Sequence, residues 1–186
     1  MVLREYLIVS LTLLICCGSA LCRTEQINKD AASALYTLAE TCSYFNCPSG
    51  WPARAPGRQS CYIYRSDSKT WTSARDTCSG LGGHLLSLDS LTEMATVRDF
   101  LKSEYGKSST PWVWTGLNDR SKEGQYKWTG FGGSLSKSSN MWNSGEPNNH
   151  KDWWGPDEDC GEFNGYKLND LNCDEKRPFI CEFIPQ

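Results

Sequence analysis

The feature that most constrains this chain is its cysteine content, because 10 cysteines occur among 186 residues. So many thiols favour an oxidising compartment, in which disulfides staple a loop-rich fold. The length accommodates one domain with an appendage, or at most two small domains. A hydrophobic fraction of 39% is too high for a disordered chain, and no region is basic enough to indicate a nucleic-acid partner.

The first 22 residues have the pattern of a secretory signal peptide. Arg4 precedes an apolar run from Leu7 to Cys17, and small residues follow at positions 18–20. A membrane-spanning helix needs about 18 or more apolar residues, so this run is too short to span. The alternative is an uncleaved anchor, which no further basic residue supports. We therefore expect a secreted, extracellular protein without a membrane span. The cleavage site determines whether Cys22 is part of the mature chain.

Residues 23–46 carry apolar side chains at the period of a helix. The positions are Ala31, Leu35, Leu38, Cys42 and Phe45. Fewer than three heptads are present, which is short for a coiled coil. Two interpretations remain open. The segment is either a short amphipathic helix lying on its own domain or a small dimerising neck, in which Cys42 links two chains into a disulfide-bonded homodimer.

Residues 47–186 form one compositional unit with both helical and strand patterns. Strands are expected at residues 60–64, 112–117 and 179–183. A first helix follows a candidate N-cap, Thr70, and its apolar face comprises Trp71, Ala74, Cys78 and Leu81. A second helix follows the capping-box pair Ser90 and Glu93, with Met94, Val97, Leu101 and Tyr105 on one face. Residues 118–170 read mostly as turns, and so long a segment is usually functional.

Negative charge is concentrated between Glu146 and Asp170. This segment holds seven acidic residues against two lysines, a balance of −5, whereas the whole chain carries −3. Crowded carboxylates repel one another unless a cation lies among them. The alternative is a solvated acidic loop, which explains poorly why the acids alternate with Trp153, Trp154 and several asparagines.

The residue types in this segment favour calcium. Hard divalent cations take about six to eight oxygen ligands from carboxylates and carbonyl groups. The candidate ligands are Glu146, Asn148, Glu158, Asn169 and Asp170. A cis peptide before Pro147 would turn the side chains on either side of it in one direction. Zinc is disfavoured, because the chain has only two histidines and no thiol pairs free of disulfide duty.

A series of short motifs runs in order along residues 47–185. It comprises Cys47 and Cys61 around a tryptophan, Trp71 to Cys78, Gly82-Gly83-His84-Leu85-Leu86-Ser87, Trp114-Thr115-Gly116-Leu117, Trp142, Gly145-Glu146-Pro147-Asn148, Glu158-Asp159-Cys160, Asn169-Asp170, Cys173 and Phe179-Ile180-Cys181-Glu182. In this order the motifs resemble those of the C-type lectin domain. The resemblance implies an α+β fold with two helices, small antiparallel sheets and a double loop whose long part holds calcium and ligand.

The resemblance also implies a pairing for six of the cysteines, for which sequence alone allows about 15 arrangements. The implied bridges are Cys47–Cys61, Cys78–Cys181 and Cys160–Cys173. Cys42, and Cys22 if it is retained, stay unassigned.

In sugar-binding members of the family, the residues matching the five candidate ligands hold the principal calcium. Glu146, Asn148, Glu158 and Asn169 are then expected to contact sugar hydroxyls as well. The Glu-Pro-Asn order implies mannose, N-acetylglucosamine or fucose, which have equatorial 3- and 4-hydroxyls, and thus glycans on cells or microbes as partners. An auxiliary calcium is implied at Asp119, Glu123, Asn149, Glu158 and Asp159.

Two departures from the family pattern bear on the site. Leu168 replaces the usual tryptophan before Asn169, which changes apolar packing rather than a ligand atom. The loop before Cys160 is longer by a few residues and includes Trp153 and Trp154, which either stack on a sugar or pack the loop.

Two other functions compete with sugar binding. Catalysis is not expected, because the chain lacks a recognisable general-base arrangement, phosphate loop or dinucleotide motif. The stronger alternative keeps the fold and calcium but binds proteins, ice or a carbonate mineral surface.

Overall fold

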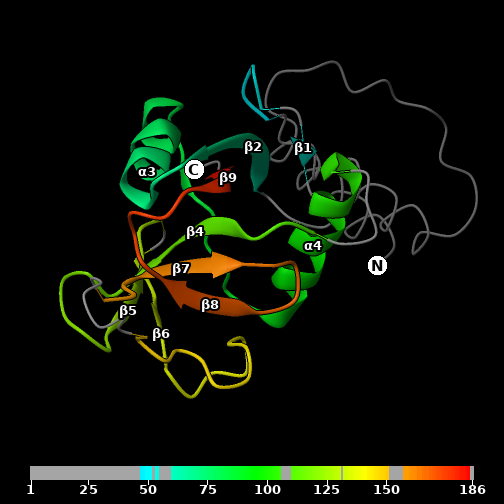
Figure 1. Cartoon of the computed structure of the whole chain (residues 1–186). Helices are drawn as coiled ribbons and strands as arrows, with labels where there is room; N and C mark the ends of the chain where they lie inside the picture. The colour runs from blue at the N-terminus through cyan, green and yellow to red at the C-terminus, as the bar shows by residue number, and fades with distance from the viewer. Residues whose placement is uncertain are drawn as a thin grey trace, which may run out of the picture. The chain divides into compact units, whose positions relative to one another are not determined.

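A computed structural model describes residues 47–51, 53–54, 60–105, 110–130, 132–150 and 157–184. Residues Cys47–Gln186 form a compact unit of their own (Figure 1). The expected signal peptide, the helical segment 23–46 and Cys42 lie outside the described residues. Within the described part of the chain, no helix is long and apolar enough to cross a membrane.

The described elements are two helices and nine strands, in agreement with the α+β expectation. The helices are α3 (Trp71–Gly80) and α4 (Leu91–Tyr105). The strands are β1 (Ala53–Arg54), β2 (Cys61–Lys69), β3 (His84–Leu85), β4 (Val113–Asn118), β5 (Tyr126–Trp128), β6 (Ser134–Leu135), β7 (Cys160–Phe163), β8 (Leu168–Leu171) and β9 (Arg177–Phe183).

Both helices begin where the capping residues predict. The hydroxyl of Thr70 accepts the N–H of Ser73, and that of Ser90 accepts the N–H of Glu93. The expected apolar faces are buried except at their last positions. Leu81 is 41% exposed and Tyr105 is 37% exposed. The inclusion of Leu81 in the buried face was wrong because this residue caps the C-terminus of α3, where the chain leaves the helix.

The C-terminal strand β9 lies at the centre of the sheet. It pairs antiparallel with β2 and β3, as the expected antiparallel sheets require, and makes one parallel pair with β4, between Phe179 and Trp114. The β4 strand also pairs with β5 and with β7, and β7 pairs with β8 (Figure 1). Through β4, the strand order links β2 and β9, which lie near the two ends of the domain, to β7 and β8, which carry part of the acidic segment.

The reading of residues 118–170 as mostly turns missed four strands, β5 to β8. Two of them are very short, and β7 is buried at every position, so it lacks the alternation that marks a half-exposed strand. The core that encloses β7 includes the fully buried Phe163 and Leu168. Leu168 therefore contributes apolar packing, as its side chain predicts.

The three implied disulfides are all present. Cys47–Cys61 ties the start of the domain to β2, and Cys78–Cys181 ties α3 to β9. Cys160–Cys173 joins the start of β7 to the chain that follows β8. The third bridge fixes the two ends of the β7–β8 hairpin, on which part of the acidic segment lies.

Candidate calcium and ligand site

The carboxylate of Asp170 anchors the loop that contains the Glu-Pro-Asn motif. Asp170 lies in β8 and is fully buried. Its Oδ1 accepts the N–H of Asn148 at 3.1 Å, and its Oδ2 accepts the N–H of Asn149 at 2.9 Å. The hydroxyl of Tyr126 donates to Oδ2 at 2.9 Å. These three donors hold the loop and the Tyr126 side chain against the buried carboxylate of Asp170.

Glu146 and Asn148 stand on either side of Pro147, and the Glu146–Pro147 peptide is cis. The Oε2 atom of Glu146 accepts the N–H of Asn148 at 3.1 Å, which holds this carboxylate beside the loop backbone. Burial raises the pKa of Glu146, and a hydrogen bond with Asp170 together with that residue's charge raises it further. The carboxylate of Asp170 is thus close enough to disfavour the ionised form of Glu146.

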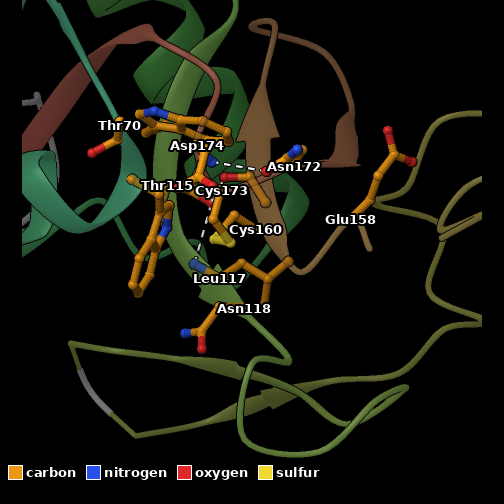
Figure 2. Close-up of a disulfide and its surroundings, with 12 residues drawn as sticks. Thr70, Thr115, Leu117, Asn118, Glu158, Cys160, Asn172, Cys173 and Asp174 are labelled. Carbon is orange, nitrogen blue, oxygen red and sulfur yellow. Dashed lines mark hydrogen bonds between the residues drawn. A yellow bond between two sulfur atoms is a disulfide. The ribbon is translucent and has the colours of Figure 1, made fainter. Parts of the chain in front are cut away.

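Glu158 approaches the same loop from the segment before β7. Its Oε2 accepts the N–H of His150 at 2.9 Å, and its own N–H donates to Oδ1 of Asn149 at 3.0 Å. Burial raises the pKa of Glu158; the N–H of His150 opposes that shift, and the charge of Asp170 adds to it. Figure 2 shows the Glu158 side chain projecting away from the Cys160–Cys173 disulfide.

Asn169, the last expected principal ligand, precedes Asp170 in β8. Its Nδ2 donates to Oε1 of Glu162 at 3.0 Å, across the antiparallel pair of β7 and β8. The other oxygen of Glu162 accepts a bond of 2.7 Å from Nε of Arg177. Burial raises the pKa of Glu162, and the charge of Arg177 opposes that shift.

The fold therefore brings together the segments that carry the five expected ligands. Hydrogen bonds through the loop backbone connect Glu146 and Asn148 to Asp170, Asn149 joins Glu158 to the same loop, and Asn169 is adjacent in β8. The carboxylates of Glu146 and Glu158 have raised pKa values and lie beside the fully buried carboxylate of Asp170. Such a group of carboxylates suits a hard divalent cation.

Three of the expected auxiliary ligands form a second acidic cluster. One carboxylate oxygen from each of Asp119, Glu123 and Asp159 lies within 4.8 Å of the others. Asp119 is 1% exposed, and its Oδ1 has no hydrogen-bond partner among the described residues. Its Oδ2 accepts the N–H of Gly124 at 2.7 Å. Burial raises the pKa of Asp119 to about 6, and the charges of Glu123 and Asp159 add to the shift.

An orphaned, buried carboxylate oxygen facing two further carboxylates is a donor set that fits calcium. Asn149 also belongs to the expected auxiliary set. Its amide oxygen already accepts a hydrogen bond from the N–H of Glu158. Lys137 lies 3.6 Å from Glu123 and offsets part of the cluster's charge.

Sequence reasoning overlooked three residues that support the site: Tyr126, Glu162 and Arg177. The sequence does carry a signal for Glu162, which is the single charged residue in the otherwise apolar strand from Cys160 to Phe163. If that strand is buried, its carboxylate requires a partner. The two loop tryptophans, Trp153 and Trp154, lie outside the described residues, so their interpretation stays a prediction.

A family model described as the lectin C-type domain matches residues 67–183, which is more than half of the chain. The chain belongs to the C-type lectin domain family. Domains of this family are in general carbohydrate-binding modules, and they generally bind Ca²⁺.

Two relatives illustrate the range of proteins that carry such a C-type lectin domain. A perlucin-like protein of Mytilus galloprovincialis is 31% identical over 144 residues, 73% of this chain and 82% of the relative. The human C-type lectin domain family 17, member A is 34% identical over 142 residues, 76% of this chain. The chain spans only 33% of the length of the human relative.

Solved structures share the fold at moderate identity. The carbohydrate-recognition domain of cow CD23, determined in the presence of a GlcNAc2Man3 oligosaccharide, is 29% identical with a TM-score of 0.59. The match covers 76% of this chain and 98% of the CD23 domain. A calcium-independent type II antifreeze protein is 24% identical with a TM-score of 0.58, over 75% of this chain and 95% of its own, and shows the fold alone.

Proposed function

We propose that this C-type lectin domain binds carbohydrate through calcium and prefers sugars with equatorial 3- and 4-hydroxyls, as in mannose, N-acetylglucosamine or fucose. The observation that carries the proposal is the docking of the Glu146-Pro147-Asn148 loop on the buried carboxylate of Asp170. This contact holds the loop that carries Glu146 and Asn148 against Asp170 in β8. In this proposal Glu146, Asn148, Glu158, Asn169 and Asp170 hold the ion.

The proposed ligands divide their polar atoms between metal and sugar. When bound, calcium supplies a positive centre that accepts hydroxyl oxygens into its coordination shell. The amides of Asn148 and Asn169 have donor hydrogens for sugar hydroxyls, whereas the carboxylates of Glu146 and Glu158 accept from them. The auxiliary ion is proposed at Asp119, Glu123 and Asp159, with Asn149 and Glu158 beside them. Trp153 and Trp154 are proposed to stack on the sugar.

The remaining proposals concern the protein as a whole. Residues 1–22 are proposed as a secretory leader, residues 23–46 as a helical segment and residues 47–186 as the lectin domain. The extracellular partners are proposed to be glycans on cells or microbes, and the function to be binding without catalysis. A neck dimer is proposed through Cys42, and Cys42→Ser should then abolish a dimer band on a non-reducing gel. A monomer in both proteins would remove the neck.

Retention on mannose-agarose tests the proposed function. The chain should be retained in calcium and released by a chelator. The double substitution Glu146→Gln with Asn148→Asp should weaken mannose retention and favour galactose, because it exchanges the acceptor and donor positions around the sugar hydroxyls. Glu104→Gln, at the exposed end of α4, makes a similar carboxylate-to-amide change outside the site and should leave retention unchanged.

Unchanged mannose retention by the double variant would contradict the assignment of the sugar contacts. A protein that binds calcium but ignores all immobilised sugars would favour the alternative function, attachment to a protein, ice or mineral surface.

A further inference from the structure

The buried carboxylate of Glu162 has one hydrogen-bond donor for each oxygen. Oε1 accepts Nδ2 of Asn169 at 3.0 Å, and Oε2 accepts Nε of Arg177 at 2.7 Å. Glu162 is 3% exposed, and it faces Asn169 directly in the register of β7 and β8. An ionised carboxylate only accepts hydrogen bonds, so both neighbours must present a donor to it.

This arrangement selects one of the two orientations of the Asn169 amide. The amide is planar, and its oxygen and nitrogen lie on opposite sides of Cγ. With Nδ2 bonded to Glu162, Oδ1 faces away from that carboxylate. The flipped amide would bring two oxygens together in a buried place, which costs a hydrogen bond and adds repulsion.

We propose that Glu162, held in place by Arg177, is a positioning residue that turns Oδ1 of Asn169 toward the principal cation. The inference rests on the proposed function, because that function makes Oδ1 a metal ligand. The second hydrogen of Nδ2 stays available for a sugar hydroxyl. Partners behind metal ligands commonly set the ligand's orientation and thereby the affinity for the ion.

Arg177 is needed because a lone carboxylate in this position would be unfavourable. Its Nε bond occupies the oxygen of Glu162 that does not face Asn169, which aims the other oxygen across the hairpin. Arg177 also lies 3.7 Å from Glu175, whose side chain is 57% exposed. The arginine thus contacts one buried and one exposed glutamate, and only the buried one contacts Asn169.

Substitution by glutamine distinguishes positioning from plain stabilisation. In Glu162→Gln the new amide has one oxygen for two neighbouring donors. The charged Arg177 takes that oxygen, so the new NH₂ group faces Asn169 and draws Oδ1 toward itself. Adding Asn169→Asp restores the match, because the aspartate accepts from the new NH₂ with one oxygen and offers the other to the ion.

The test measures calcium affinity of the full chain by isothermal titration, with the melting temperature of each variant in chelator as a second readout. Glu162→Gln should weaken calcium binding by about tenfold or more. The double variant Glu162→Gln with Asn169→Asp should return to within about threefold of the original affinity. Glu175→Gln, which removes the exposed partner of Arg177, should bind as the unsubstituted chain does.

Three outcomes separate the possibilities. Equal calcium affinity in Glu162→Gln and the unsubstituted chain would overturn the positioning role while leaving the proposed function intact. Weakened binding that follows the melting temperature and is not rescued by Asn169→Asp would assign Glu162 a structural role only. An unsubstituted chain that binds neither calcium nor sugar would remove the proposed function, and this inference with it.

Discussion

Replacing Asp119 by asparagine should stabilise the metal-free protein at neutral pH. Burial is the main reason that the pKa of Asp119 rises from 3.8 to about 6, and its Oδ1 has no hydrogen-bond partner among the described residues. Asparagine keeps an oxygen for the N–H of Gly124, and its NH₂ group can donate to the carboxylates of Glu123 and Asp159. The substitution therefore removes the unfavourable charge without removing the one hydrogen bond that the side chain of Asp119 accepts from the described residues.

The magnitude follows from proton linkage. The pKa of Asp119 is higher in the folded than in the unfolded chain, so between pH 3.8 and about 6 the folded state binds more protons. Stability is then lost as the pH rises through this window. At about 1.4 kcal/mol for each pH unit, the loss is about 3 kcal/mol at most, or roughly 10 °C in melting temperature for a domain of this size.

Thermal unfolding in chelator provides the assay. At about pH 7.5, Asp119→Asn should melt above the unsubstituted chain by up to that amount. The difference should shrink as the pH falls and vanish at about pH 3, where Asp119 is mostly neutral in both states. Calcium should reverse the order, because it binds the folded site of the unsubstituted chain and stabilises it by mass action. Asp174→Asn, a matched substitution at an exposed position, should leave the melting temperature in chelator at about pH 7.5 unchanged.

An Asp119→Asn variant less stable than the unsubstituted chain in chelator at neutral pH would show that the buried charge of Asp119 is not destabilising. A difference of the same size at about pH 4 and about pH 7.5 would refute the linkage as well.

Two further predictions concern packing around the site and the core. Tyr126→Phe removes the hydroxyl that donates to Asp170, so the free energy of unfolding should fall by about 1–3 kcal/mol. Chemical denaturation without calcium measures this free energy, and an unchanged value would show that the bond contributes nothing. Gly83→Ala should lower the free energy of unfolding by about 1–3 kcal/mol, because a Cβ there would clash with the carbonyl oxygen of Glu182. In Gly80→Ala the new Cβ meets no atom, so this variant should not lose stability. Equal denaturation midpoints for the two variants would contradict this.

The sequence predicts the features that depend on local pattern or on recognisable motifs. Thr70 and Ser90 marked both helix starts, and the ordered motifs implied all three disulfides that the structure contains. The same motifs placed Glu146 and Asp170 in one site, which the loop contacts bring together.

Features that depend on strand register were not predictable in the same way. Glu162 and Arg177 are separated by 15 positions, and their strands β7 and β9 are brought near each other because both pair with β4 at Trp114. Tyr126 reaches Asp170 across 44 positions, from a strand of three residues that was read as a turn. Such partners become visible only when the pairing of strands is known, since neither residue carries a local signal for the other.

In the proposed function, one calcium ion is held by the protein and by the sugar at the same time. Calcium affinity measured with and without saturating methyl mannoside tests this most directly, because linkage requires each ligand to strengthen the other by the same factor. Calcium should bind more tightly in the presence of the mannoside, and methyl galactoside should cause no such change. An identical calcium affinity with and without the mannoside would contradict this prediction.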